Sequence, residues 1–82
     1  MPRYYFDLRD GEELAIDEEG LELSNLRAVQ LEAARALADL ARETLQDTIS
    51  GVHHYMAIQV RDDIGPVMQV RFTFEVETVG HG

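Results

Sequence analysis

The stretch Met68–Glu77 reads MQVRFTFEVE, and its apolar and polar residues alternate at every position. Successive side chains of a β-strand point to opposite faces, so a period of two predicts a strand with one buried face. The apolar face is Met68, Val70, Phe72, Phe74 and Val76, and the polar face is Gln69, Arg71, Thr73, Glu75 and Glu77. The alternation therefore predicts a sheet that packs one of its faces against a hydrophobic core.

Two further segments show the same alternation and turn it into two hairpins. His54, Met56, Ile58 and Val60 share one face of a segment that reaches the last strand through the loop Asp62–Pro66. At the start of the chain, Tyr4, Phe6 and Leu8 precede the turn signal Asp10-Gly11 and a short alternation at Leu14 and Ile16. Gly and Pro reverse the chain at such positions. We therefore expect one hairpin on each side of the middle segment.

The middle segment changes to the spacing of a helix. Its main apolar stripe is Leu26, Val29, Ala33, Leu37, Leu40 and Thr44. With Ser24 as the N-terminal cap and Gly51 as the terminator, the pattern predicts a helix from about Asn25 to Ile49. A second apolar strip lies beside the first and consists of Leu31, Ala34, Ala38 and Leu45. This strip either lies under the loop that contains Leu21 and Leu23, or is covered by a second copy in a symmetric dimer.

The order of elements is therefore β-β-α-β-β. It predicts an α+β fold in which a single long helix packs on one face of a roughly four-stranded antiparallel sheet. The chain has 82 residues, which is enough for one hydrophobic core. We expect a single domain over residues 1–79 and a disordered tail at 80–82. The strand order does not follow from the pattern.

The charge balance excludes several classes of partner. Sixteen acidic and seven basic residues give a formal net charge of −9. Nucleic-acid binding needs a basic surface, so DNA is not expected as a partner and RNA is disfavoured. No apolar run has the length of a membrane span or a signal peptide, and no cysteine is present for a disulfide. We therefore expect a cytoplasmic protein with no membrane partner.

Residue types that carry chemistry are present without a convincing arrangement. Asp47, Ser50, His53 and His54 are the types of a Ser-His-Asp triad, but triads are assembled from distant loops, and Ser50 more simply ends the helix. His53 and His54 are neighbours on a predicted strand and point to opposite faces, so they cannot chelate one ion together. The acidic turns at 10–13 and 17–20 match no calcium loop and are interpreted as solvated. We expect no enzymatic activity, no metal and no cofactor.

One face of the predicted sheet is rich in tyrosine and arginine. The residues expected there as partner-binding residues are Tyr5, Arg9, Tyr55, Arg61 and Arg71. Tyr and Arg are enriched at protein interfaces, and an RNA-reading sheet uses a similar composition. The alternative is a solvated face on which the arginines pair with Asp7, Glu75 and Glu77 across strands.

The chain also resembles known families. The opening MPRYYFDLRDG (1–11), the stretch DEEGLEL (17–23), the Ala-rich helix from Leu26 and the segment VRDDIG (60–65) are similar to a family of short proteins of unknown function from rhizobia and related alphaproteobacteria. This resemblance implies a bacterial, cytoplasmic protein and supplies no activity. In architecture, the Tyr-rich strand followed by an Ala-rich helix also resembles HicB-type antitoxins, although Leu23-Ser24-Asn25 replaces their Pro-Gly turn.

Three hypotheses for the function follow from these features. The first is a small acidic, non-enzymatic protein-interaction module that self-associates and presents its Tyr/Arg sheet face or its helix strip to a protein. The second is an antitoxin-like or regulatory protein that binds a basic toxin or an RNA-processing partner through its negative charge. The third is a small metal- or ligand-binding protein that uses the acidic turns with His53 or His54.

Overall fold

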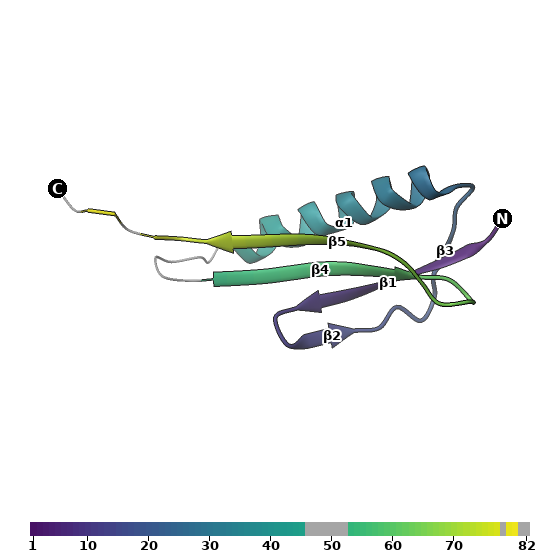
Figure 1. The fold of residues 1–82 in the computed structure, drawn as a ribbon, viewed down its shortest axis with the longest axis horizontal. Coiled ribbons are helices and arrows are strands. Elements are labelled where there is room, and N and C mark those ends of the chain that lie inside the picture. The colour runs from purple at the N-terminus through teal and green to yellow at the C-terminus, as the bar shows by residue number, and fades with distance from the viewer. Residues whose placement is uncertain (46–52, 78, 81–82) are drawn as a thin grey trace.

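The structure, a computed structural model, describes residues 1–45, 53–77 and 79–80 (Figure 1). Its elements are β1 (Arg3–Asp10), β2 (Glu13–Ala15), β3 (Leu21–Glu22), α1 (Leu26–Leu45), β4 (His53–Arg61) and β5 (Pro66–Glu75). The described strands form one antiparallel sheet in the order β2-β1-β4-β5, and α1 packs on one side of it across β4 and β5. The predicted α+β class and the two hairpins are confirmed.

The strand β3 was not predicted. It pairs with the first residues of β1, where Tyr4 lies opposite Leu21, whereas β2 pairs with the last residues of β1, where Leu8 lies opposite Ala15. Both short strands therefore lie along the same edge of β1, and the sheet has five strands in the described residues instead of about four. Leu23 packs against the core, whereas Leu21, opposite Tyr4 at this edge of the sheet, is 40% exposed.

The core lies between α1 and the sheet. On α1 the buried positions are Val29, Ala33, Leu37 and Ala41, at 0 to 7% exposure, and on β4 they are Met56, Ile58 and Val60. The predicted helical stripe is confirmed at Val29, Ala33 and Leu37, but the buried Ala41 was not part of it and Leu26 is 55% exposed. The predicted apolar faces of β4 and β5 are confirmed, whereas Leu14 and Ile16 of the first hairpin are 44% and 54% exposed. At 100° per residue Leu26 points within the buried stripe, about 60° around the helix from Val29, so its direction does not explain its exposure; it is the first residue of α1, at the end of the stripe.

The helix begins one residue later than its predicted cap implies. Leu26 is the first helical residue, and the Asn25 side-chain Oδ1 accepts a hydrogen bond from the Ala28 N–H at 2.8 Å. Asn25 is therefore the cap, and the assignment of this role to Ser24 was wrong. Asn satisfies the free N–H of the third helical residue as well as Ser does. The predicted continuation of the helix to Ile49 and its terminator Gly51 lie outside the described residues.

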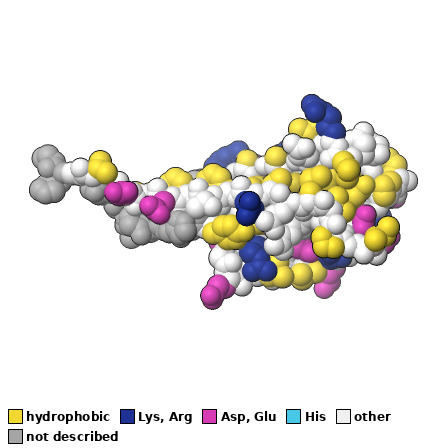
Figure 2. All heavy atoms as spheres, in the orientation of Figure 1, with side chains coloured by type: hydrophobic (Ala, Val, Ile, Leu, Met, Phe, Trp, Pro, Cys, Tyr) yellow, Lys and Arg dark blue, Asp and Glu magenta, His cyan; other side chains and the backbone are white. Residues whose placement is uncertain are grey.

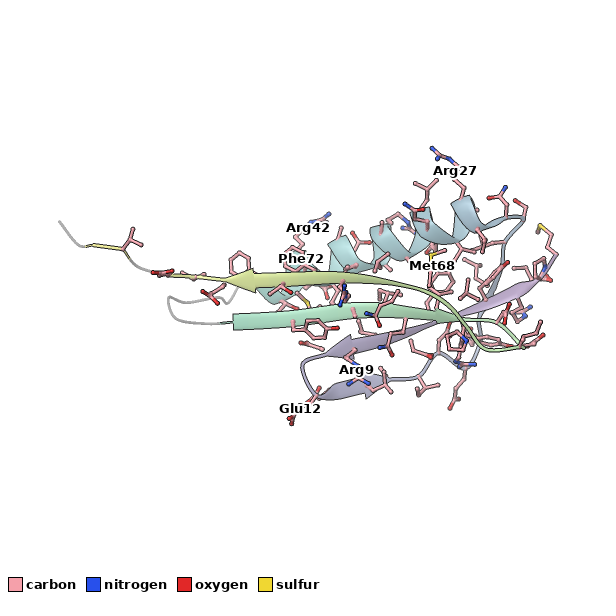
Figure 3. All side chains as sticks on the ribbon, viewed as in Figure 1. Arg9, Glu12, Arg27, Arg42, Met68 and Phe72 are labelled. Atoms are coloured by element: carbon pink, nitrogen blue, oxygen red, sulfur yellow. The ribbon has the colours of Figure 1, made fainter. Side chains whose placement is uncertain are left out.

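Within the described residues, no helix combines the length and the apolar character needed to cross a membrane. Arg27 and Arg42 project from α1 on the side turned away from the sheet (Figure 3). Of the predicted tail at 80–82, only Gly80 is among the described residues.

Candidate protein-interaction face

The face of the sheet opposite α1, called the open face below, carries the tyrosines and arginines singled out in the sequence. Its members are Arg3, Tyr5, Asp7 and Arg9 of β1, Tyr55, Ala57, Gln59 and Arg61 of β4, and Gln69, Arg71, Thr73 and Glu75 of β5. In Figure 1 β5 passes in front of α1, so Figure 2 views the molecule from the open face, with blue arginine side chains among white and yellow ones. All five predicted partner-binding residues of the sheet lie on this face.

The strand register arranges the open face in rows. Tyr5 lies opposite Arg61, and Tyr55 lies opposite Thr73. The two rows between them each cross three strands, and they run Asp7–Gln59–Gln69 and Arg9–Ala57–Arg71 from β1 through β4 to β5. The face thus has an end built around Arg61 and a middle built around Ala57, and these two regions differ in how their charges are paired.

Around Arg61 the polar groups are bound to one another. Its Nε donates to Asp7 Oδ2 at 2.9 Å, and its Nη2 donates to the backbone oxygen of Asp17 at 3.0 Å. Its guanidinium carbon lies 4.5 Å from the centre of the Tyr5 ring, which is the geometry of a cation–π contact. The hydrogen bond to Asp7 raises the pKa of the Arg61 guanidinium. Because these contacts use Arg61 and Tyr5 within the fold, they describe a structural cluster, in which Asp7 is 7% exposed.

Asp17 attaches the chain between β2 and β3 to the edge of β1. Its Oδ2 accepts a hydrogen bond from the Phe6 N–H at 3.1 Å, and its Oδ1 accepts from the N–H groups of Glu19 and Gly20 at 3.1 and 3.2 Å. Its own N–H donates to Asp7 Oδ1 at 3.0 Å. On the edge of β1 away from β4, no described strand pairs with Phe6, and the Asp17 carboxylate accepts the Phe6 N–H in its place. The sequence analysis missed this role, because it interpreted residues 17–20 as a solvated turn.

Asp17 makes the stability of the fold depend on pH. Partial burial raises its pKa, but the hydrogen bonds from Phe6, Gly20 and Glu19 and the charge of Arg61 together lower its pKa below the usual 3.8. A carboxyl with a lower pKa in the folded state stabilises the fold above its unfolded pKa, and this contribution is lost as the pH falls through the folded pKa.

Asp17→Asn is accordingly expected to lower the free energy of unfolding near neutral pH, with a difference from wild type that shrinks as the pH falls from about 4 toward 2. Urea unfolding at several pH values, followed by circular dichroism, measures this difference. Glu18→Gln removes one charge from the neighbouring position and serves as the control. An equal acid dependence in wild type and Asp17→Asn would contradict the role assigned to Asp17.

The middle of the open face has arginines without such partners. Ala57 is fully buried although it lies on this face, and Arg9 and Arg71 flank it on the adjacent strands. Among the described residues, neither arginine has a carboxylate within 4.0 Å. In the neighbouring row, Gln59 Nε2 donates to Gln69 Oε1 at 3.0 Å. Within the described part of the chain, the two guanidinium groups next to Ala57 therefore form no ion pair.

Comparison with known proteins bears on this arrangement. Residues 3–73 match the model of a protein family described as a domain of unknown function, DUF6894. The chain belongs to this family. The match runs from the start of β1 to Thr73, two residues before the end of β5, so it reaches every described helix and strand. The resemblance to a family of unknown function is confirmed in that respect. No curated protein and no solved structure matches the chain.

The second strip of α1 in this family domain faces solvent. Leu31 is 59% exposed, and Ala34 and Ala38 are exposed as well. The side chain of Leu45, the fourth predicted partner-binding residue of the strip, lies outside the described residues. Of the two alternatives for the strip, burial under the loop of Leu21 and Leu23 is therefore wrong for Leu31, Ala34 and Ala38.

The domain also has a groove near the β4–β5 turn. It encloses about 510 Å³ and is lined by Asp7, Gln59, Val60, Arg61, Pro66, Val67, Met68 and Gln69. A concave site of ligand size was not expected from the sequence, and this volume lies within the range of small-molecule sites. The register with β5 shifts between Val60 and Arg61, and both residues line the groove. Its polar lining is largely self-paired, as Asp7 with Arg61 and Gln59 with Gln69.

Residues considered for catalysis or metal binding add little to this site. Asp47 and Ser50 lie outside the described residues, and so do the side chains of His53 and His54. Within the part of the chain that the structure describes, no group of three or more His, Asp or Glu side chains is arranged to hold a metal ion.

Proposed function

We propose that this protein is a non-enzymatic protein-interaction module that self-associates and binds an acidic segment of a second protein on its open face. The observation that carries the proposal is the pair Arg9 and Arg71, which flank the buried Ala57 and have no carboxylate within 4.0 Å among the described residues. Guanidinium groups bind carboxylates through two parallel hydrogen bonds, so each arginine offers a specific contact.

The geometry of the middle rows supports a flat or extended partner. Arg9 and Arg71 stand on strands separated by β4, which places their Cα atoms about 10 Å apart at the usual strand spacing. Ala57 lies between them, and its small side chain does not fill the space between the two arginine side chains. Tyr55 is partly buried in the adjoining row, where its ring and hydroxyl add apolar area and a hydrogen-bonding group. Tyr and Arg together are the side chains that contribute most binding energy at protein interfaces.

The position of these arginines contrasts with the charge of the chain. The net charge is −9, and four of the seven arginines, Arg3, Arg9, Arg61 and Arg71, belong to strands of the sheet where the polar face is turned away from α1. The arginines of this face attract an acidic segment, whereas the acidic side chains elsewhere on the surface repel it. Charge therefore directs the partner to the open face. We further propose a bacterial, cytoplasmic setting, supported by the opening residues and the cysteine-free composition.

Arg9→Glu is expected to weaken binding of the partner about tenfold or more, because it places a carboxylate where the proposed contact needs a guanidinium. The partner is first captured from a lysate of the source organism on the immobilised full chain. The purified partner is then titrated into wild type and variant by calorimetry. Binding must persist after nuclease treatment, and its loss would identify nucleic acid as the ligand and overturn the proposal.

Arg27→Glu is the matched control, because it changes the net charge by the same amount on the outer side of α1 (Figure 3). We expect it to change the affinity by less than about twofold at physiological salt. Equal weakening by both substitutions would show that the open face is not the binding site. Strengthening by both would show that the partner is basic, as the antitoxin-like alternative requires.

A further inference from the structure

The outer edge of β5 is an unpaired strand edge. In the strand order β2-β1-β4-β5 it ends the sheet, and within the described residues no strand pairs with its far side. Such an edge exposes a row of backbone N–H and C=O groups that can pair with another strand. Of the devices that block edges, proline and a register shift occur at its beginning, where Pro66 lies opposite Arg61. The rest of β5 is regular.

The side chains of β5 that face α1 are incompletely covered. Val70, Phe72 and Phe74 are only partly buried, whereas Met56 and Ile58 at the corresponding level of β4 are 0 and 4% exposed. The rings of Phe72 and Phe74 stack at 6.3 Å between their centres. An added strand beside β5 would cover these three residues, because β4 covers one side of them and the edge leaves the other side open.

The sequence of β5 is self-complementary around Thr73. Two copies can pair antiparallel with Thr73 opposite Thr73 of the second copy. The residue numbers of any two facing positions then add up to 146. Arg71 then lies opposite Glu75, Phe72 opposite Phe74 and Val70 opposite Val76, and each pair occurs twice by symmetry. Opposite charges and aromatic pairs directly across two strands stabilise a sheet.

We infer that two copies of this chain pair through their β5 edges, antiparallel and centred on Thr73, to form one continuous sheet. Two alternative centres place like charges opposite each other, since a centre on Arg71 pairs arginine with arginine and a centre on Glu75 pairs glutamate with glutamate. A centre on Gln69 places Arg71 opposite Val67 and so gives it no opposite charge. The strand that fits this edge is β5 of a second copy. On an antiparallel copy the order Arg–Thr–Glu is reversed, so each charged side chain faces one of opposite charge. A twofold interface of this kind is the commonest route to a symmetric dimer.

This inference rests on the self-association in the proposed function and assigns it to a surface. It differs from pairing through the exposed helix strip at Leu31, Ala34 and Ala38. Its test does not depend on the acidic partner, since the test uses the chain alone. In the dimer Arg71 faces Glu75 of the second copy, so Arg9, two strands from the edge, is the arginine left for the acidic segment. The two copies would place their open faces side by side, because the face alternation continues across paired edges.

The test measures the dimerisation Kd by sedimentation equilibrium for wild type, Arg71→Glu, Glu75→Arg and the double substitution. Each single change places like charges opposite each other twice, so we expect each to raise Kd about ten- to hundredfold. The double substitution exchanges the two charges and restores the pairing. An equimolar mixture of the two single variants is also expected to dimerise, because one chain supplies both carboxylates and the other both guanidinium groups.

Arg27→Glu, on the outer side of α1, controls for net charge and is expected to leave the dimerisation Kd unchanged. A wild-type chain that stays monomeric at every concentration would overturn both the self-association and the edge pairing. A dimer that Arg71→Glu and Glu75→Arg leave intact and Leu31→Glu disrupts would overturn the edge pairing alone. Failure of the double substitution or the mixture to restore the dimer would overturn the register centred on Thr73.

Discussion

Replacement of Gly20 by alanine is expected to lower the free energy of unfolding by about 2–4 kcal/mol, because the change adds backbone strain and a steric clash. Gly20 has φ +72°, a conformation that residues with a Cβ rarely adopt. A Cβ built there would lie 2.9 Å from Arg3 Cγ, 2.9 Å from Tyr5 Cε1 and 3.0 Å from the Tyr4 carbonyl oxygen. The last of these atoms is backbone within β1, and the Tyr5 ring is held against the guanidinium of Arg61, so neither can move at low cost.

Gly11→Ala is the matched control for this prediction. Gly11 has a similar φ of +62°, but a Cβ there would meet no heavy atom within 4 Å. Its substitution therefore carries the backbone strain alone, about 1 kcal/mol. Urea unfolding of both variants, followed by circular dichroism, separates the two contributions. Equal losses for Gly11→Ala and Gly20→Ala would show that the close approach of the chain at Gly20 to β1 does not contribute to stability.

The sequence alone predicted the features that depend on the local spacing of apolar residues. The alternation around Phe72 and the helical spacing around Leu37 placed both residues toward the core, because the direction of a side chain follows from strand or helix geometry alone. The helix cap was missed by one residue for a related reason. Ser24 and Asn25 are both good caps, and only the orientation of the first turn, set by packing against the sheet, selects Asn25.

The sequence was insufficient where distant segments meet. If the β1–β2 hairpin kept its register, Asp17 would lie opposite Phe6, but the chain leaves the strand there and its carboxylate accepts the Phe6 N–H instead. No local pattern distinguishes such an aspartate from the solvated Glu18 beside it. The short strand β3 depends on the same departure, and so was not foreseen.

The open face shows the same division between local and long-range information. Alternation placed Tyr5, Arg9 and Arg61 on one side of the sheet, but it could not separate a paired arginine from an unpaired one. The difference arises from the neighbours across strands, since Arg61 reaches Asp7 and the backbone of Asp17, whereas Arg9 faces the small Ala57. Strand order decides these neighbours, and the sequence does not contain it in any local pattern.

Met56→Ala is expected to lower the free energy of unfolding by about 3 kcal/mol. Met56 is fully buried on β4, between β1 and β5 and under α1, and it is among the largest fully buried side chains of the described residues. Its truncation leaves a cavity that β4 cannot close, since this strand is paired with β1 on one side and β5 on the other. A domain of 82 residues has a total stability on the order of 4–12 kcal/mol, so this single loss removes a large fraction of it.

Met68→Ala removes the same atoms from β5. A comparison with Met56→Ala therefore isolates the effect of the position in the sheet. Met68 packs against the core but is only partly buried, because β5 ends the sheet (Figure 3). We expect a loss of about 1 kcal/mol there, since less apolar area is returned to water and the edge can relax into the space. Thermal and urea unfolding at concentrations below the dimerisation Kd give both values for the single chain. A loss at Met68 that matched the loss at Met56 in the monomer would contradict the placement of β5 at the edge.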